Sequence, residues 1–399
     1  MPAATRPALG SPTALRGLLI AFAANGFGYG VIGATIPALQ DHLQTDALGI
    51  GVLLMILGTA AIIGINVGGR VSDTHGALRP MQVGTTAMAF GLIALPWTGS
   101  IWTACLVALA LGFGNGALDV SMNALGVQLE LHRDHPVMSR LHAFFSIGGL
   151  AVALLVVLLG QARLSGGRLV LVAMTTVGVA LLASVFFQER WSAQSLVVSH
   201  ADDSGSRTRI PRAAWLLGAM AVCFAVAEGT AMDWSAYDVK AIAQVSDATA
   251  ALGVVAVSAT MVTIRLFGDR AVHLLGRRAV VRFGAATAAV GYLICVLVSP
   301  LGLLLLGWAV VGLGMGLVAP QIYGLAGNLA GGRGLSVVVS MGYAAGLLGP
   351  GVIGSLVHVA GVSRALIAPL VLAIALSILS FRMPEVARAA SQPVPTPAL

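Results

Sequence analysis

Charged side chains are scarce in this chain: of 399 residues, only 9% are charged whereas 58% are hydrophobic. A soluble domain carries about 25% charged residues, so this chain does not supply the surface of a soluble protein. Only three cysteines are present, and their spacings indicate neither a disulfide framework nor a metal cluster. The mean hydropathy of +0.93 instead indicates an integral membrane protein.

Nucleotide-binding and catalytic motifs are also missing. The chain contains no Walker-type Gly-Lys-Ser/Thr run, no His-Glu-x-x-His pair and no Gly-x-Ser-x-Gly elbow. These absences argue against ATP-driven transport and against hydrolytic chemistry. We therefore expect no enzyme activity, no cofactor and no metal. The net charge of +7 follows from membrane orientation, as argued below, and does not indicate nucleic-acid binding.

Long apolar stretches dominate the rest of the sequence. A membrane crossing takes about 20 mainly apolar residues, and its backbone must satisfy its own hydrogen bonds, which favours helices. Twelve such stretches are predicted, at 15–38, 48–68, 80–98, 101–126, 138–160, 168–187, 213–236, 248–267, 279–298, 301–327, 336–358 and 363–381. The fold class is therefore all-α integral membrane.

The positive charges predict the orientation. If the N-terminus lies in the cytoplasm, 18 of the 22 Lys and Arg residues fall in cytoplasmic segments. Short cytoplasmic loops are enriched in these residues, so we expect both termini inside and a plasma-membrane location.

A polar segment divides the twelve spans into six and six. The predicted parts are tails at 1–14 and 382–399, bundles at 15–187 and 213–381, and a cytoplasmic linker at 188–212. An internal repeat supports this division: Gly112-Phe-Gly114-Asn-Gly116 reappears 200 residues later as Gly312-Leu-Gly314-Met-Gly316. Two pseudo-symmetric six-helix bundles are therefore expected.

A loop after the second span combines glycine with opposite charges. Glycine lets helix ends approach, and Asp with Arg can form a charge-assisted lock between the bundles. The second half carries a diverged copy, in which Arg265 occupies the place of the first glycine. We expect a cytoplasmic gate built from Gly69, Asp73, Gly76 and Arg79 with Asp269, Arg270 and Arg277.

The fourth span carries an acidic residue between two amides. Asn115, Asp119 and Asn123 follow one another at four-residue steps and share one helical face. A carboxylate inside a membrane span is costly, so it faces protein or water and commonly has a function. Two interpretations stay open for Asp119: a static ion pair with Arg140, or a proton or substrate role.

The seventh span carries two acids. Glu228 lies about 22 Å into the span by helical rise and is our first candidate for reversible protonation, with Asp119 second. Asp233 is expected close to the outer surface as a solvated residue. Trp234 and Tyr237 are expected to anchor the helix in the membrane interface.

Uncharged polar and aromatic residues on other spans are candidates for substrate contact. Tyr and Trp at membrane depth can stack on a ligand and offer one hydrogen bond. The candidate set is Asn25, Tyr29, Asn115, Asn123, Trp308 and Tyr323. Each of them has packing as its alternative role.

Taken together, the twelve spans, the repeat and the glycine–charge loop resemble the major facilitator superfamily. The runs from Gly112 to Asn123 and from Glu228 to Trp234 are similar to a poorly characterised bacterial inner-membrane branch, distantly akin to fucose-permease-like symporters. The resemblance implies a central cavity lined by spans 1, 4, 7 and 10 and worked by alternating access. The two-acid scheme of fucose permeases does not carry over, since span 1 offers Asn25 and no acid.

These observations predict a secondary active transporter for a small organic solute, coupled to protons. Two alternatives stay open: a proton-driven exporter of drugs or metabolites with the same fold, and a non-transporting membrane sensor or scaffold. The expected partners are a small-molecule substrate, protons and the lipid bilayer, without nucleic acid, and the protein is expected to be a monomer. A sugar, a neutral molecule or a cation suits the predicted cavity better than a strong anion.

Overall fold

The structure is a computed structural model that describes residues 12–132, 137–191 and 211–384. Within these ranges it is built from helices, and no strand occurs among the described residues. The predicted tails and the linker at 188–212 lie largely outside these ranges. The helices are α1 (Pro12–His42), α2 (Ala47–His75), α3 (Leu78–Ala94), η1 (Leu95–Trp97), α4 (Ile101–Leu131), α5 (Met138–Gln161), α6 (Gly166–Trp191), α7 (Arg212–Ala243), α8 (Asp247–Ala250), α9 (Leu252–Leu266), α10 (Gly268–Leu275), α11 (Arg277–Leu297), α12 (Leu301–Met315), α13 (Val318–Ala360), α14 (Val362–Ala365), α15 (Ile367–Leu379) and η2 (Ser380–Arg382).

The twelve-span fold is confirmed. Eleven stretches of the described chain are long and apolar enough to cross a membrane. The remaining predicted span, the third at 80–98, corresponds to α3, whose 17 residues are continued by the short helix η1. The tenth and eleventh spans, Leu301–Ala326 and Val337–Ala360, share α13, which covers the end of the former and all of the latter.

Local signals fix where several helices begin. The hydroxyl of Ser100 accepts a hydrogen bond from the Thr103 amide, and the hydroxyl of Thr103 accepts one from the Ser100 amide, which forms a capping box at the start of α4. The carboxylate of Asp46 caps α2 by accepting from the Gly49 amide. Such caps satisfy amides that the first helical turn leaves unpaired.

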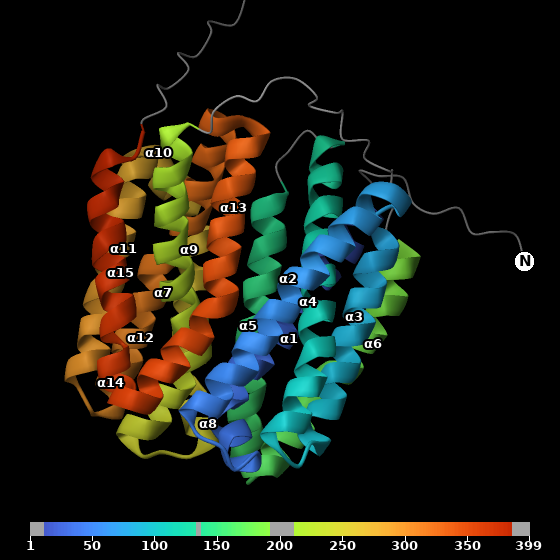
Figure 1. Ribbon diagram of the computed structural model, residues 1–399, viewed down its shortest axis with the longest axis vertical. Helices are drawn as coiled ribbons and strands as arrows, with labels where there is room; N and C mark the ends of the chain where they lie inside the picture. Colours follow the sequence, from blue (N-terminus) through green and yellow to red (C-terminus); the bar gives the residue numbers. More distant parts are fainter. Residues whose placement is uncertain (1–11, 133–136, 192–210, 385–399) are drawn as a thin grey trace, which may run out of the picture.

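The helices form two bundles with matching internal contacts, α1–α6 in one and α7–α15 in the other (Figure 1). In the first bundle α2 and α3 pack on α4, and α1 packs on α5 and α6. In the second bundle α9 and α11 pack on α12, and α7 packs on α13 and α15. Each pairing in one bundle thus has a counterpart in the other.

Glycine contacts repeat between the bundles at the same offset of 200 residues. A Cβ atom on Gly84 would lie 2.7 Å from the carbonyl oxygen of Gly114, and one on Gly284 would lie 2.6 Å from that of Gly314. Small residues allow this backbone approach, which stabilises helix pairs in lipid. The repeat seen in the sequence is therefore a repeat of helix-packing sites.

Substituting one of these glycines tests that role. In Gly114→Ala the new methyl would lie 2.5 Å from the Met88 amide nitrogen. We expect the free energy of unfolding to fall by about 1–3 kcal/mol, the usual cost of overpacking. Gly302→Ala is the matched control, because nothing lies within 4 Å of its Cβ. Thermal unfolding in detergent should separate the two variants, and equal melting temperatures would contradict the packing role.

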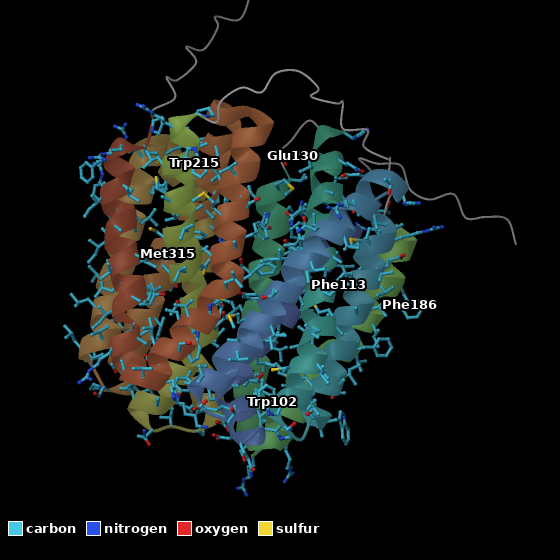
Figure 2. All side chains as sticks on the ribbon, viewed as in Figure 1. Trp102, Phe113, Glu130, Phe186, Trp215 and Met315 are labelled. Carbon is cyan, nitrogen blue, oxygen red and sulfur yellow. The ribbon has the colours of Figure 1, made fainter. Side chains whose placement is uncertain are left out.

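Large apolar side chains cover the outside of the protein as well as its interior. Trp97 and Trp102 are 75% and 76% exposed, and Trp102 lies at the end of the molecule opposite to Trp215 (Figure 2). Exposed tryptophan at both ends is typical of the two membrane interfaces. The prediction that Trp234 anchors its helix in the membrane interface is wrong, since Trp234 is fully buried and packs edge-on against Tyr237.

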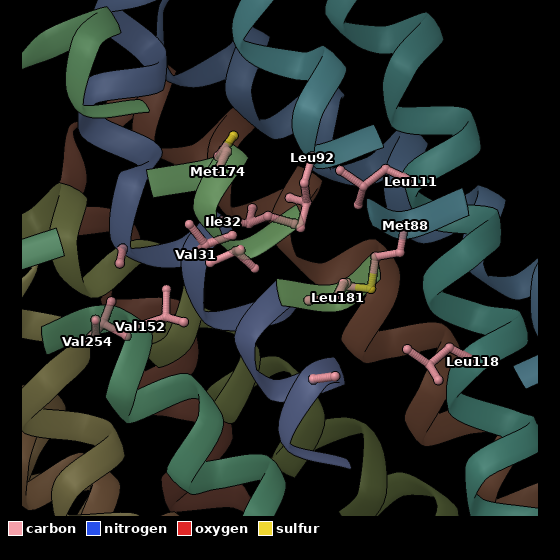
Figure 3. Packing of buried hydrophobic residues seen from close by; sticks show 14 of the residues in the cluster. Val31, Ile32, Met88, Leu92, Leu111, Leu118, Val152, Met174, Leu181 and Val254 are labelled. Carbon is pink, nitrogen blue, oxygen red and sulfur yellow. The ribbon is translucent and has the colours of Figure 1, made fainter. Parts of the chain in front are cut away.

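The two bundles meet over much of their length. The helix end at which α1 and α7 begin is called here the basic end, because most arginines lie there, and the opposite one the far end. Contacts between the bundles join α2 with α13, α5 with α9 and α1 with α7. Val152 of α5 and Val254 of α9 share one hydrophobic core (Figure 3). A Cβ on Gly354 would lie 2.6 Å from the Gly51 Cα, so α13 and α2 cross in direct backbone contact.

Candidate functional site

A small cavity lies between the bundles, with a volume of about 30 Å³. Helices α1, α2, α3 and α4 contribute its walls on one side, and α7 and α13 on the other. Most of the lining is apolar, including Leu54, Leu111 and Leu347. Its polar lining residues are Tyr29, Asn115 and Asp233. The first two were predicted as substrate contacts, and the structure brings them together.

Asp233 is the site residue that the sequence interpretation missed. The expectation of a solvated residue near the outer surface is wrong, since Asp233 is only 5% exposed. Helix α7 continues to Ala243, which places Asp233 about 15 Å from the helix end by helical rise. A Cβ on Gly33 would contact the carbonyl oxygen of Met232. The direct approach of α1 and α7 therefore holds Asp233 at the bundle interface.

Glu228, the first candidate for protonation, forms an ion pair with Arg265. Arg265 Nη2 lies 3.2 Å from Glu228 Oε1, and the two side chains are 21% and 26% exposed. Arg265 Nε also donates to the carbonyl oxygen of Gly316, at 3.0 Å, and Nη1 donates to Ser146 Oγ. In the sequence Arg265 takes the place of the first glycine in the second, diverged gate loop. In the structure it lies on α9 and links α7, the end of α12 and α5, the last of which belongs to the other bundle.

Asp119 also contacts the opposite bundle. Its Oδ2 accepts a hydrogen bond from Tyr343 Oη at 2.9 Å, and Asn123 Nδ2 donates to its Oδ1 at 3.3 Å. The sequence left open an ion pair between Asp119 and Arg140. In the structure the partners of Asp119 are instead Tyr343 and Asn123. Asp119 thus joins α4 to α13 through a neutral partner.

The remaining candidates lie apart from the cavity lining. Asn25 is 2% exposed and donates from Nδ2 to Met122 Sδ at 3.8 Å. Trp308 is fully buried inside the second bundle, where its Nε1 donates to Asp238 Oδ2 at 3.0 Å. Tyr323 is partly buried with its hydroxyl against Gly342 of α13. The structure therefore gathers Tyr29 and Asn115 at the cavity and leaves Asn25, Trp308 and Tyr323 in neighbouring packing.

The predicted cytoplasmic gate lies at the basic end. Gly76 and Gly276 end α2 and α10 with φ of 84° and 80°, the positive values that favour glycine. The arginines of the gate (Arg79, Arg270 and Arg277) and Asp73 are exposed, while Gly69 is half-buried. The side chain of Asp269 lies outside the described residues. A lock among these groups stays a prediction.

Ion pairs join the two bundles at the far end. Lys240 Nζ of α7 lies 2.5 Å from Asp41 Oδ2 of α1 and 2.7 Å from Asp247 Oδ1. The other carboxylate oxygen of Asp247 accepts from the Gly166 amide at 3.2 Å. His358 Nδ1 of α13 lies 2.9 Å from Asp46 Oδ2 at the start of α2. The far end is thus held together by polar contacts between the bundles.

Asp46 provides a test of this end that depends on pH. The hydrogen bond from the Gly49 amide holds the pKa of the Asp46 carboxyl below its ordinary value, and nearby His358 adds to the lowering. Asp46→Ala should cost about 1 kcal/mol at neutral pH, as for other caps. A depressed folded-state pKa contributes stability above about pH 3.9, the unfolded value, and loses it as pH falls through the folded value. The difference from wild type, followed by thermal unfolding against pH, should shrink below about pH 4. Asp46→Asn keeps a cap and serves as control.

The described residues were compared with the requirements of a metal site and of a disulfide. Among them no group of three or more His, Cys, Asp or Glu side chains could hold a metal ion. Cys105, Cys223 and Cys295 are free and buried. The polar groups at the cavity and around Glu228 and Asp119 are carboxylates, hydroxyls, amides and one guanidinium, which can exchange protons and bind a solute.

Comparison with known proteins places these features in a family. Residues 18–236 match the model of the Major Facilitator Superfamily. The chain is 31% identical to an uncharacterized transporter, y4wD, of Sinorhizobium fredii, over 87% of this chain and 92% of that protein. It superimposes on a mutant of the nucleoside transporter NupG with a TM-score of 0.75 at 13% identity, covering 92% of this chain and 99% of NupG. A D-xylose-proton symporter gives a TM-score of 0.75 at 15% identity, covering 93% and 97%. At these identities the two structures show the shared fold alone.

Proposed function

The chain belongs to the major facilitator superfamily, and on that premise we propose that it moves a small organic solute across the bacterial plasma membrane by proton-coupled alternating access. In this mechanism two bundles rock about a central site and expose it to each side of the membrane in turn. The positive-inside distribution of arginine supports a cytoplasmic basic end. The far end then faces outward.

The distribution of contacts between the bundles supports the alternating-access part. The far end is joined by Lys240, His358 and their carboxylate partners. The cavity of about 30 Å³ holds only about two or three water molecules, since each needs about 10–15 Å³. A solute therefore enters only when the bundles part.

The proposal of proton coupling rests on the contacts of Arg265. Its guanidinium is shared between Glu228 of its own bundle and Ser146 of the other. Protonation of Glu228 removes the charge that orients Arg265 and so weakens the contact across the interface. Glu228 remains the first coupling candidate. Asp119 is the second, because its protonation would change the hydrogen bond to Tyr343 across the same interface.

We assign solute contact to the polar residues of the cavity wall. Tyr29 and Asn115 present a hydroxyl and an amide there. Asn25 and Tyr323 are the next candidates, since a side-chain oxygen of Asn25 is buried without a hydrogen-bond partner and Tyr323 lies on α13, which contributes to the cavity wall. Trp308 is assigned to packing in the second bundle because Asp238 already accepts from its indole nitrogen.

The proposal is tested in two steps. A thermal-shift screen against sugars, nucleosides and amines finds binders, since a ligand of the native state raises apparent stability. Each binder is then added to proteoliposomes that contain a pH-sensitive dye. We expect solute flux accompanied by a change in lumenal pH, and loss of that change in Glu228→Gln. Flux without a pH change refutes proton coupling, and binding without flux favours a sensor. The direction of flux under an imposed gradient separates uptake from export.

A further inference from the structure

Asp233 is an acid without a partner in a closed site. In the part of the chain that the structure describes, it makes no hydrogen bond or ion pair, although it is only 5% exposed. By contrast, Glu228 is paired with Arg265 and Asp119 with Tyr343. A buried carboxylate without a partner is costly, so a site that retains one is built to receive something.

The cavity around Asp233 contains no positive charge of its own. None of the described lining residues is Lys, Arg or His. Beside the carboxylate lie the phenol of Tyr29 and the amide of Asn115, and the remaining wall is made of aliphatic side chains, Met88 and glycine. Tyr29 can also hold a cation over its ring face. The wall therefore suits a ligand with a charged head and an apolar body.

We propose that the central cavity binds a small solute through its protonated amine, with Asp233 as the counter-ion and Tyr29 and Asn115 beside it. This inference rests on the proposed transport function, whose substrate class it specifies. The amine supplies the charge that the protein leaves out, and its N–H groups donate to the carboxylate in charge-assisted hydrogen bonds.

The rest of the solute is accommodated by separation of the bundles. Gly58 of α2 packs against the carbonyl of Leu347 on α13, and both residues line the cavity. When this glycine contact opens, the apolar walls of Leu54 and Leu347 become available to the hydrocarbon part of the solute. The amine head is thus fixed first and the body is enclosed by the same helices that move.

Matched pairs of probes test the inference by binding alone. Ethylamine, cyclohexylamine and phenethylamine are each compared with the alcohol of the same skeleton, using protein in a neutral detergent and tryptophan fluorescence. At pH 7 the amines are cations and the alcohols are not, so each pair differs mainly in charge. We expect at least one amine to bind tenfold or more tightly than its alcohol.

Variants identify the residue responsible. Asp233→Asn should abolish the amine preference, and Asp233→Glu should retain it. Glu130→Gln is the matched control, because it also removes one carboxylate but lies at the basic end, where Glu130 accepts from the Val137 and Met138 amides (Figure 2). This control should keep the preference of the wild type.

Two results would overturn the inference. One is that no amine is preferred over its alcohol in the wild-type protein, which needs no variant to fold. The other is that the preference survives in Asp233→Asn. Proton-coupled flux of a neutral sugar without amine binding would refute this inference and leave the proposed function standing. Amine binding without any flux would support this inference and refute the proposed transport function.

Discussion

Arg265→Gln is expected to abolish proton-coupled transport and to destabilise the protein more than Glu228→Gln does. The arginine joins three helices, through Glu228, Ser146 and the carbonyl of Gly316. Without it, Glu228 is left as an unpaired carboxylate within the membrane. Without Glu228, the guanidinium keeps its other two acceptors. The two single variants are therefore not equivalent.

The size of the effect follows from how far the pair is buried. Removing one partner of a fully buried ion pair costs about 3–5 kcal/mol. The side chains here are 21% and 26% exposed, and water screens such a pair, so we expect a loss of about 2 kcal/mol in the free energy of unfolding for Arg265→Gln. The double variant Glu228→Gln/Arg265→Gln should recover about half of this stability, since no unpaired charge remains.

Unfolding and transport are measured on the same preparations. Arg168→Gln is the control, because Arg168 is exposed at the start of α6 and its loss should change stability by less than about 0.5 kcal/mol. The recovered double variant should still fail to couple flux to protons, which separates stability from coupling. Unchanged coupling in Arg265→Gln would show that the ion pair is structural.

The sequence predicts the fold well because a membrane protein repeats a few simple constraints. The length of a span follows from the thickness of the bilayer. Because the backbone in lipid must satisfy its own hydrogen bonds, each apolar span is expected to be a helix. The repeat seen at Gly114 and Gly314 is a packing rule between helices, so it carries over into paired contacts with Gly84 and Gly284. Twelve spans and two related bundles are therefore readable without coordinates.

The site is harder to predict because it depends on which way a side chain points. Asp233 was assigned to the surface from a span that ended too early, and Arg265 was noted only as a departure from the gate motif. Both interpretations follow chain position, whereas the structure turns each side chain into the bundle interface. No pattern within α9 indicates that Arg265 meets Glu228, which is 37 residues away in sequence. The presence of a second acid in the seventh span, five residues after Glu228, was the one sequence signal for Asp233.

Lys240→Met is expected to open the far end of the protein. Lys240 lies between Asp41 of one bundle and Asp247 of the other. Its removal deletes two ion pairs and leaves two carboxylates close together without a counter-ion. A partly exposed pair contributes about 0.2–1 kcal/mol. With the added repulsion, the open state should gain about 1.4 kcal/mol, which corresponds to a tenfold larger population.

Opening can be read from labelling of a cavity residue. Leu54 is 6% exposed and lines the cavity, so Leu54→Cys should react with a membrane-impermeant maleimide from the far side only when that end opens. Cys105, Cys223 and Cys295 are buried and give the background rate in the variant without the added cysteine. We expect about tenfold faster labelling with Lys240→Met than without it.

Arg364→Met supplies the comparison that isolates the ion pairs. Arg364 is exposed in α14 at the same end, and its substitution removes the same positive charge without touching Asp41 or Asp247. Labelling should stay within about twofold of the parent, because a lone surface charge shifts energies by less than about 0.5 kcal/mol. If Lys240→Met and Arg364→Met label at equal rates, the far-end ion pairs do not control access. If only Lys240→Met accelerates labelling, the ion pairs of Lys240 help to keep the far end closed.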